Sequence, residues 1–266
     1  MTMLNYGDFD KFVLKKIWPA VCAGAWQRTG TEGDMQQTIE FGPAYAMATI
    51  DLAAGEDVTV EAGSMVGMSD GLQVKTHIGG NRVGFFGAIL NFLGALVKKF
   101  LGGETFFVNT YKPPEGQTGR VLVAPALAGD IIHYALDGTR SLIVQASSFL
   151  ASGGDVAVKT KFGGLKSLFS GQGAFWLVVS GAGDLWVNCY GAIEQVDVQE
   201  KYIVDTGHIV GFEDTLDYQI KGAGGLKQTL LSGEGLTCHF SGQGKLYIQT
   251  RTVGGLVGWI TPRLQG

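Results

Sequence analysis

Residues 225–250 of this chain read GLKQTLLSGEGLTCHFSGQGKLYIQT, and residues 164–188 read GLKSLFSGQGAFWLVVSGAGDLWVN. The two stretches share their order of apolar, glycine and polar residues, which indicates an internal duplication. A third related stretch, VTVEAGSMVGMSDGLQVKTHIGG, occupies residues 58–80. The copies are longer than the units of most solenoids, so each copy is expected to be a unit of several strands.

The three copies align on a turn of mostly small residues, which reads EAGS at 61–64, QASS at 145–148 and DTGH at 205–208. In each copy an apolar strand precedes the turn and a second apolar stretch follows it. We therefore predict an all-β fold of three repeated antiparallel β modules, packed around one shared core in a pseudo-threefold arrangement. The modules span about 34–124, 125–192 and 193–252.

The predicted β domain covers residues 34–266, and its last residues, GGLVGWITPRLQG, are expected to be a loose apolar tail. Residues 1–33 do not fit the repeat, and we interpret them as an N-terminal extension with a helix around Phe9–Trp18. Both ends are thus predicted to lie outside the repeated structure.

Within a module the pattern is that of short strands. QVKTH, VAVKT and YQIK alternate, whereas AFWLVV and LTCHF are rich in β-branched and aromatic residues. We predict that SGAG and SGQG are the turns of hairpins whose second strands are DLWVNCYG and KLYIQT. The GLKxL piece before each hairpin is expected to be a short helical turn. The 42 glycines are consistent with many such turns.

The first module contains an insertion, GGNRVGFFGAILNFLGALVKKFLGG, that its sister modules lack. Its apolar residues recur with helical spacing and predict an amphipathic helix at Phe85–Leu101. The predicted partner or membrane contact consists of Phe85, Phe86, Ile89, Phe92, Leu93, Leu96 and Phe100. Three uses of this helix stay open, namely packing on the β core, contact with another subunit, and docking on a membrane surface.

Charge and cysteine content exclude several classes of protein. The net charge of −4 disfavours a partner bound mainly through phosphates, so we expect no nucleic acid. Cys22, Cys189 and Cys238 are far apart and form no CxxC pair, which argues against a disulfide framework or a structural zinc site. Buried thiols in a reducing compartment are the simpler interpretation. The chain shows neither a secretory signal nor a long uninterrupted apolar stretch, and we expect a cytoplasmic protein.

Possible catalytic signals are weak. The sequence YIVDTGHIV resembles the loop that presents the catalytic aspartate of aspartic proteases, but Asp205 aligns with Gln145 and Glu61 in the other copies. The same turn therefore occurs without its carboxylate. The four histidines have no metal-ligand spacing, and no serine lies in a GxSxG elbow. We predict no catalytic residue, no metal site and no cofactor, and expect the chain not to be an enzyme.

Several ordered blocks resemble the altered inheritance of mitochondria protein 24 family over about residues 35–252. They include EAGSMVGMSDGLQVKT, LGGETFFVNTY, SLIVQASSFLAS and VDTGHIVGFEDTLDYQI. The resemblance implies an uncharacterised prokaryotic member with a fold similar to that of the trp RNA-binding attenuation protein, a short double-stranded β-helix or sandwich. It also implies assembly into larger oligomers, and its mitochondrial relatives are associated with inner-membrane architecture. RNA binding does not transfer on fold alone.

The leading hypothesis is a non-enzymatic, homo-oligomeric β scaffold or interaction protein. The inserted helix would provide a partner contact or a peripheral contact with the inner membrane. One alternative is a small-ligand binding module with pockets between modules or subunits. A second alternative is an enzyme whose site is assembled across modules.

Overall fold

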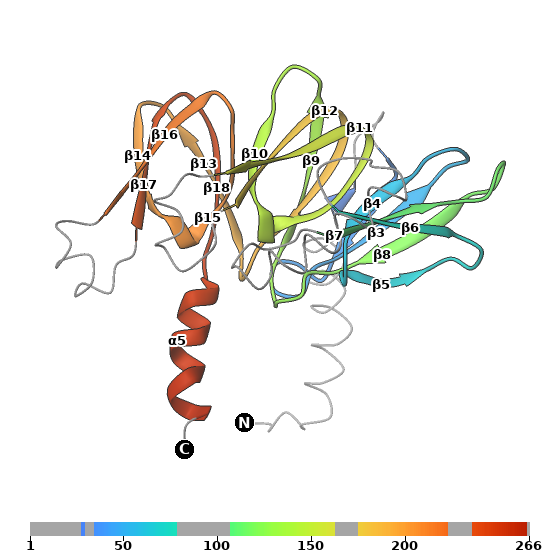
Figure 1. Cartoon of the computed structure of the whole chain (residues 1–266), viewed down its shortest axis with the longest axis horizontal. Helices are drawn as coiled ribbons and strands as arrows, with labels where there is room; N and C mark the ends of the chain where they lie inside the picture. The colour runs from blue at the N-terminus through green and yellow to red at the C-terminus, as the bar shows by residue number, and fades with distance from the viewer. Residues whose placement is uncertain (1–27, 30–34, 79–106, 163–174, 223–235, 265–266) are drawn as a thin grey trace, which may run out of the picture.

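The computed structural model describes residues 28–29, 35–78, 107–162, 175–222 and 236–264. Antiparallel strands make up most of this part of the chain, with one α-helix at its C-terminal end (Figure 1). The all-β prediction is therefore confirmed.

A five-stranded sheet holds most of the first module. Its strands lie in the order β1 (Arg28–Thr29), β2 (Gln37–Glu40), β3 (Met47–Leu52), β8 (Gly119–Val123) and β5 (Met65–Met68). Burial alternates along β3, where Ala48, Ile50 and Leu52 point into the core. This two-residue period is typical of a sheet with one face packed and one face exposed.

A ten-stranded sheet runs through all three modules. Its order is β13 (Ile193–Val198), β18 (Gly244–Gln249), β15 (Ile209–Glu213), β10 (Leu142–Gln145), β12 (Phe175–Asn188), β11 (Phe149–Phe162), β4 (Val58–Glu61), β7 (Phe107–Lys112) and β6 (Gln73–Ile78), with β9 (Ile131–Asp137) paired to β12. A three-stranded sheet follows the order β14 (Lys201–Asp205), β17 (Leu236–Gly242) and β16 (Leu216–Gly222). Short 3-10 turns, η2 (Ala146–Ser148) and η4 (Thr206–His208), precede β11 and β15.

The same irregular strand pairing occurs once in each module. The register shifts by one residue between Met65 and Gly67 where β5 pairs with β8, between Phe149 and Ala151 where β11 pairs with β12, and between Ile209 and Gly211 where β15 pairs with β18. A β-bulge of this kind bends the strand. It lies directly after the aligned turn in each case.

The buried apolar residues form three clusters rather than one shared core. One cluster is built mainly from the first module, one from the second and one from the third, with a few residues contributed across each boundary. Figure 1 shows the modules in a row, with β5 at one end and β14 at the other. The predicted pseudo-threefold arrangement around one shared core is therefore not confirmed, because the buried apolar residues form three separate clusters.

The predicted hairpin turns at SGAG (residues 180–183) and SGQG (residues 241–244) are wrong. The strand β12 runs through SGAG without a break and pairs with β11 from Phe149 to Phe162. The stretch SGQG separates β17 from β18, which lie in different sheets and do not pair with each other. Within SGAG, Gly181 has a φ of +112°, and a Cβ at this position would collide with the carbonyl oxygen of Asp155. The glycines of SGAG therefore allow β12 to bend while it stays paired with β11, and they do not form a chain reversal.

The predicted loose tail is also wrong, because residues Val253–Leu264 form the helix α5. The side-chain oxygen of Thr252 accepts a hydrogen bond from the backbone N–H of Gly255 at 3.0 Å, which is an N-cap contact. The helix projects away from the sheets in Figure 1, and none of its residues is buried. No helix within the described ranges has the length and apolarity needed to cross a bilayer.

Several predictions fall outside the described residues. They are the helix around Phe9–Trp18, the amphipathic helix at Phe85–Leu101, the helical turns of GLKxL and the state of Cys22. Most of the predicted extension 1–33 is also outside them, although Arg28 and Thr29 pair with β2.

Candidate functional site

The predicted contact residues Phe85, Phe86, Ile89, Phe92, Leu93, Leu96 and Phe100 all lie outside the described residues. The structure therefore does not place them relative to one another, and their role stays a prediction. The described residues instead contain a pocket between modules, as one alternative from the sequence expected, and a buried polar cluster that the sequence did not indicate.

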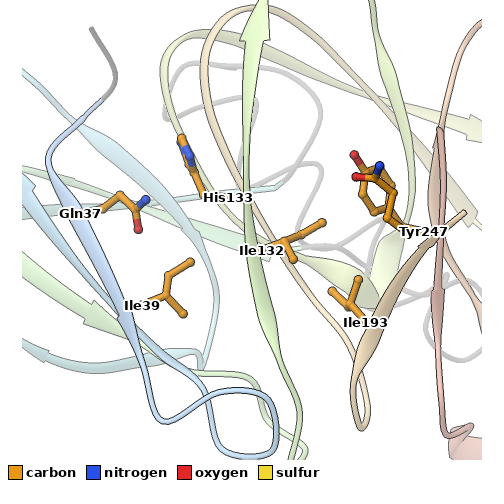
Figure 2. A pocket seen from close by; sticks show the side chains of 7 residues that line it. Gln37, Ile39, Ile132, His133, Ile193 and Tyr247 are labelled. Carbon is orange, nitrogen blue, oxygen red and sulfur yellow. The ribbon is translucent and has the colours of Figure 1, made fainter. Parts of the chain in front are cut away.

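The pocket, of about 370 Å³, opens where strands of all three modules meet. Its walls come from β2, β9, β13 and β18, and Figure 2 shows how their side chains face a common space. The lining residues are Gln37, Ile39, Ile132, His133, Ile193, Gln195 and Tyr247. The lining combines three isoleucines with four side chains that carry hydrogen-bonding groups.

One wall of the pocket is held by a hydrogen bond between His133 and Asp184. His133 Nε2 lies 2.6 Å from Asp184 Oδ1, and the other carboxylate oxygen of Asp184 accepts the backbone N–H of Met35 at 3.0 Å. The imidazole also lies against the indole ring of Trp186, with centroids 5.4 Å apart. These contacts fix the ring of His133.

A different polar group in the pocket lacks a partner. Gln37 is buried, and its Oε1 atom accepts no hydrogen bond from any described residue. A buried amide oxygen without a donor is unfavourable by about 1–3 kcal/mol. A molecule in the pocket that donates a hydrogen bond would remove this cost.

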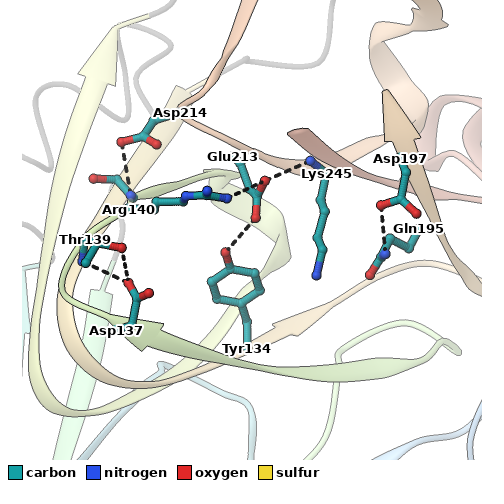
Figure 3. Close-up of polar contacts among 10 residues, drawn as sticks. Tyr134, Asp137, Thr139, Arg140, Gln195, Asp197, Glu213, Asp214 and Lys245 are labelled. Carbon is teal, nitrogen blue, oxygen red and sulfur yellow. Dashed lines mark hydrogen bonds and ion pairs between the residues drawn. The ribbon is translucent and has the colours of Figure 1, made fainter. Parts of the chain in front are cut away.

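The buried polar cluster joins the second module to the third (Figure 3). Glu213 accepts from the hydroxyl of Tyr134 at 3.2 Å and from the backbone N–H of Lys245 at 2.9 Å, and the guanidinium of Arg140 lies 3.7 Å away. Burial, followed by the charge of Glu213, raises the pKa of Tyr134 to about 12. Glu213 itself is almost fully buried.

In two of the aligned turns the first residue accepts a hydrogen bond within the turn. Asp205 Oδ1 accepts from the backbone N–H of Gly207 at 2.8 Å and so caps η4. Glu61 accepts from the hydroxyl of Ser64 at 3.1 Å, but burial raises its pKa to about 7. The Asp-Thr-Gly sequence thus has a structural role as a capped turn.

The described cysteines are unsuited to catalysis. Cys189 and Cys238 are buried and unpaired, and burial raises the pKa of each thiol to about 12. Such thiols stay protonated near neutral pH and react slowly. No group of three or more His, Cys, Asp or Glu side chains could hold a metal ion in the part of the chain that the structure describes.

The chain is similar to one family of proteins and to two streptococcal proteins. The family model described as Mitochondrial biogenesis AIM24 matches residues 38–251. An uncharacterized protein of Streptococcus pyogenes serotype M6 is 30% identical over 219 residues, covering 81% of this chain and 86% of that protein. An X-ray crystal structure of a Streptococcus pyogenes protein from a structural genomics consortium superimposes with a TM-score of 0.69 at 26% identity, covering 86% of this chain and 99% of the other.

Proposed function

The chain belongs to the mitochondrial biogenesis AIM24 family, and on this premise we propose that it is a non-enzymatic β scaffold that assembles from several copies of itself. The family membership agrees with the resemblance seen in the sequence, but it assigns no reaction and no ligand. The proposal therefore depends on the surfaces of this chain.

The observation behind it is apolar exposure at both ends of the row of modules. Met65, Val66 and Met68 are exposed on β5, and Tyr202 and Ile203 are exposed on β14. Exposed apolar residues on a sheet edge favour pairing with another chain. Two such edges on one molecule support assembly through both ends.

The polar groups support a structural role over a catalytic one. The buried carboxylates of Asp184 and Glu213 are each engaged by partners within the fold. A catalytic base must face a substrate with an available lone pair and a suitable pKa. Both carboxylates accept hydrogen bonds from partners within the fold, which supports a structural role.

Light scattering coupled to size-exclusion chromatography tests the assembly. We expect a mass that is a multiple of the monomer mass and that stays constant over a wide range of concentrations. A monomer at every concentration would refute the scaffold proposal.

We also propose a cytoplasmic location with peripheral contact to the inner membrane, on the basis of the apolar pattern at residues 85–101. Fractionation of cells that express the full chain is the test. Release from the membrane fraction by alkaline carbonate would support peripheral contact, and absence from that fraction would argue against it.

The second candidate function is binding of a small molecule in the pocket of Figure 2, favoured by the unpartnered Oε1 of Gln37. Native mass spectrometry of the purified protein should then show a retained mass that a Gln37→Leu variant loses. A library of small hydrogen-bond donors that gives neither a retained mass nor a thermal shift would count against this function.

A further inference from the structure

A polar side chain occupies an inward position of β2. Burial alternates along this strand, so Gln37 and Ile39 are buried and their neighbours on the strand are half-exposed. Inward positions of such a strand are normally apolar, because a polar group loses its hydrogen bonds to water there. The backbone of Gln37 pairs with Ile50 of β3, and this pairing does not involve the side-chain amide. The amide therefore has no role in forming the strand.

The amide of Gln37 faces the pocket between the modules. Gln37 is 3% exposed, and its Oε1 accepts no hydrogen bond from any residue that the structure describes. Figure 2 shows this side chain extending from β2 into the space that it shares with His133 and Ile39. Buried polar groups in folded proteins nearly always have a hydrogen-bond partner. The position of this oxygen indicates that its donor enters through the pocket.

Two other polar side chains of the pocket already have partners within the fold. His133 Nε2 lies 2.6 Å from Asp184 Oδ1. Gln195 Nε2 donates to Asp197 Oδ1 at 3.2 Å. Of these polar lining residues, Gln37 is the one with a buried atom that has no partner among the described residues. A ligand would therefore be held in place mainly by Gln37.

The pocket lining favours a neutral ligand. None of the described residues that line it is a lysine, arginine, aspartate or glutamate. The carboxylate of Asp184, next to His133, is itself buried and already accepts from the backbone N–H of Met35. A charged ligand would lose its hydration here without gaining an opposite charge, which is unfavourable.

We propose that this pocket binds a small neutral carboxamide whose amide group pairs with the amide of Gln37. This inference rests on the second candidate function and names the class of ligand. A carboxamide carries N–H donors and a carbonyl acceptor side by side. The ligand N–H donates to Oε1 of Gln37 while the ligand oxygen accepts from Nε2. The two groups stay complementary when the amide of Gln37 turns by half a rotation.

The apolar body of the ligand lies among the three isoleucines of the pocket. Ile39, Ile132 and Ile193 come from β2, β9 and β13, so the ligand contacts all three modules. The pocket volume of about 370 Å³ is near the lower end of the range for small-molecule sites, roughly 300–1,000 Å³. The ligand is therefore a compact amide with an aromatic or branched apolar part.

Three probes of equal size and similar shape test this class with the full chain. They are benzamide, acetophenone, which has a methyl group where benzamide has its N–H donors, and benzoate, which is charged. Ligand-observed NMR titrations measure their affinities. We expect benzamide to bind with a dissociation constant on the order of 1 mM, as suits so small a molecule. Acetophenone should bind about tenfold more weakly, and benzoate should not bind measurably.

A matched pair of variants locates the binding. Gln37→Leu removes the amide at similar volume, so it should abolish the preference for benzamide over acetophenone. Gln145→Leu is the control, because Gln145 also has an unpartnered Oε1 but does not line this pocket. It should keep the wild-type preference. Circular dichroism establishes that both variants fold.

A third variant, Ile193→Trp, fills the pocket from β13 without changing Gln37. It should weaken the binding of benzamide and acetophenone by the same factor, and so it tests the location even when Gln37→Leu does not fold. Unchanged binding of benzamide to a folded Ile193→Trp variant would contradict the proposed site.

Two results separate this inference from the function on which it rests. Equal affinities of benzamide and acetophenone for the wild type, or a Gln37→Leu variant that keeps the preference, would overturn the carboxamide class. The small-molecule function would survive that result when native mass spectrometry shows another retained molecule that Gln37→Leu loses. No binding of any probe together with no retained molecule would mean that water alone contacts Gln37 Oε1, and both the class and the binding function would fail.

Discussion

Replacement of Glu61 by glutamine should make the protein less sensitive to pH. Burial raises the pKa of Glu61 from its ordinary value of 4.5 to about 7, although the hydrogen bond from Ser64 opposes this shift. Between these two pH values the folded protein keeps a proton that the unfolded chain has lost. Stability therefore falls as pH rises from 4.5 to 7 and changes little from this group above 7.

The size of the effect follows from the shift. A rise from 4.5 to about 7 corresponds to ~3 kcal/mol when the full difference is expressed. Because the side chain is only partly buried, solvent screens the charge, and we expect ~1–2 kcal/mol. Glutamine removes the ionisation and can still accept from the Ser64 hydroxyl. The second module already has glutamine, Gln145, at this position of the turn.

Urea unfolding followed by circular dichroism at pH 5, 6, 7 and 8 measures this difference at one protein concentration. We expect Glu61→Gln and the wild type to be similar at pH 5, and the variant to be more stable by ~1–2 kcal/mol at pH 8. Glu115→Gln, at an exposed turn position, is the control and should follow the wild type. Parallel curves for Glu61→Gln and the wild type across this range would refute the reasoning.

Three further variants test separate features. Gly181→Ala places a Cβ against a backbone carbonyl at positive φ and should lower the free energy of unfolding by more than ~1 kcal/mol in thermal denaturation, whereas Gly258→Ala, with open space around it, should not. Glu213→Ala leaves the hydroxyl of Tyr134 and the backbone N–H of Lys245 without their acceptor, and should lower the free energy of urea unfolding by ~2–4 kcal/mol. A loss below ~0.5 kcal/mol would contradict a stabilising role of this polar cluster between the second and third modules. The double variant Phe92→Glu, Leu96→Glu should lose flotation with anionic liposomes, and equal flotation of variant and wild type would end the membrane hypothesis.

The sequence was sufficient for the parts of the structure that depend on neighbours along the chain. The turns at 61–64, 145–148 and 205–208 were found because small residues between apolar stretches form the same local structure in any context. The all-β class followed from alternation and β-branched residues over short windows. The family resemblance was also visible, since ordered blocks of residues keep their spacing.

The errors occurred where a distant strand decides the outcome. SGAG has the composition of a hairpin turn, but β11 pairs with β12 on both sides of it and turns the glycines into a bend. Glu213 has the local sequence of a solvated corner, but Tyr134 and Lys245 reach it from other strands. The tail GGLVGWITPRLQG contains glycines and a proline, which disfavour a helix, but residues Val253–Leu264 are helical and Thr252 caps the first turn.

By itself the sequence predicted an all-β fold, which the structure confirms, and located three similar turns. Only the tertiary structure decided how the units join, because strand pairing connects residues that are far apart in the chain and leaves no local pattern. The pairing of β4 with β11 and of β10 with β15, for example, joins residues about 90 and about 70 positions apart in the sequence.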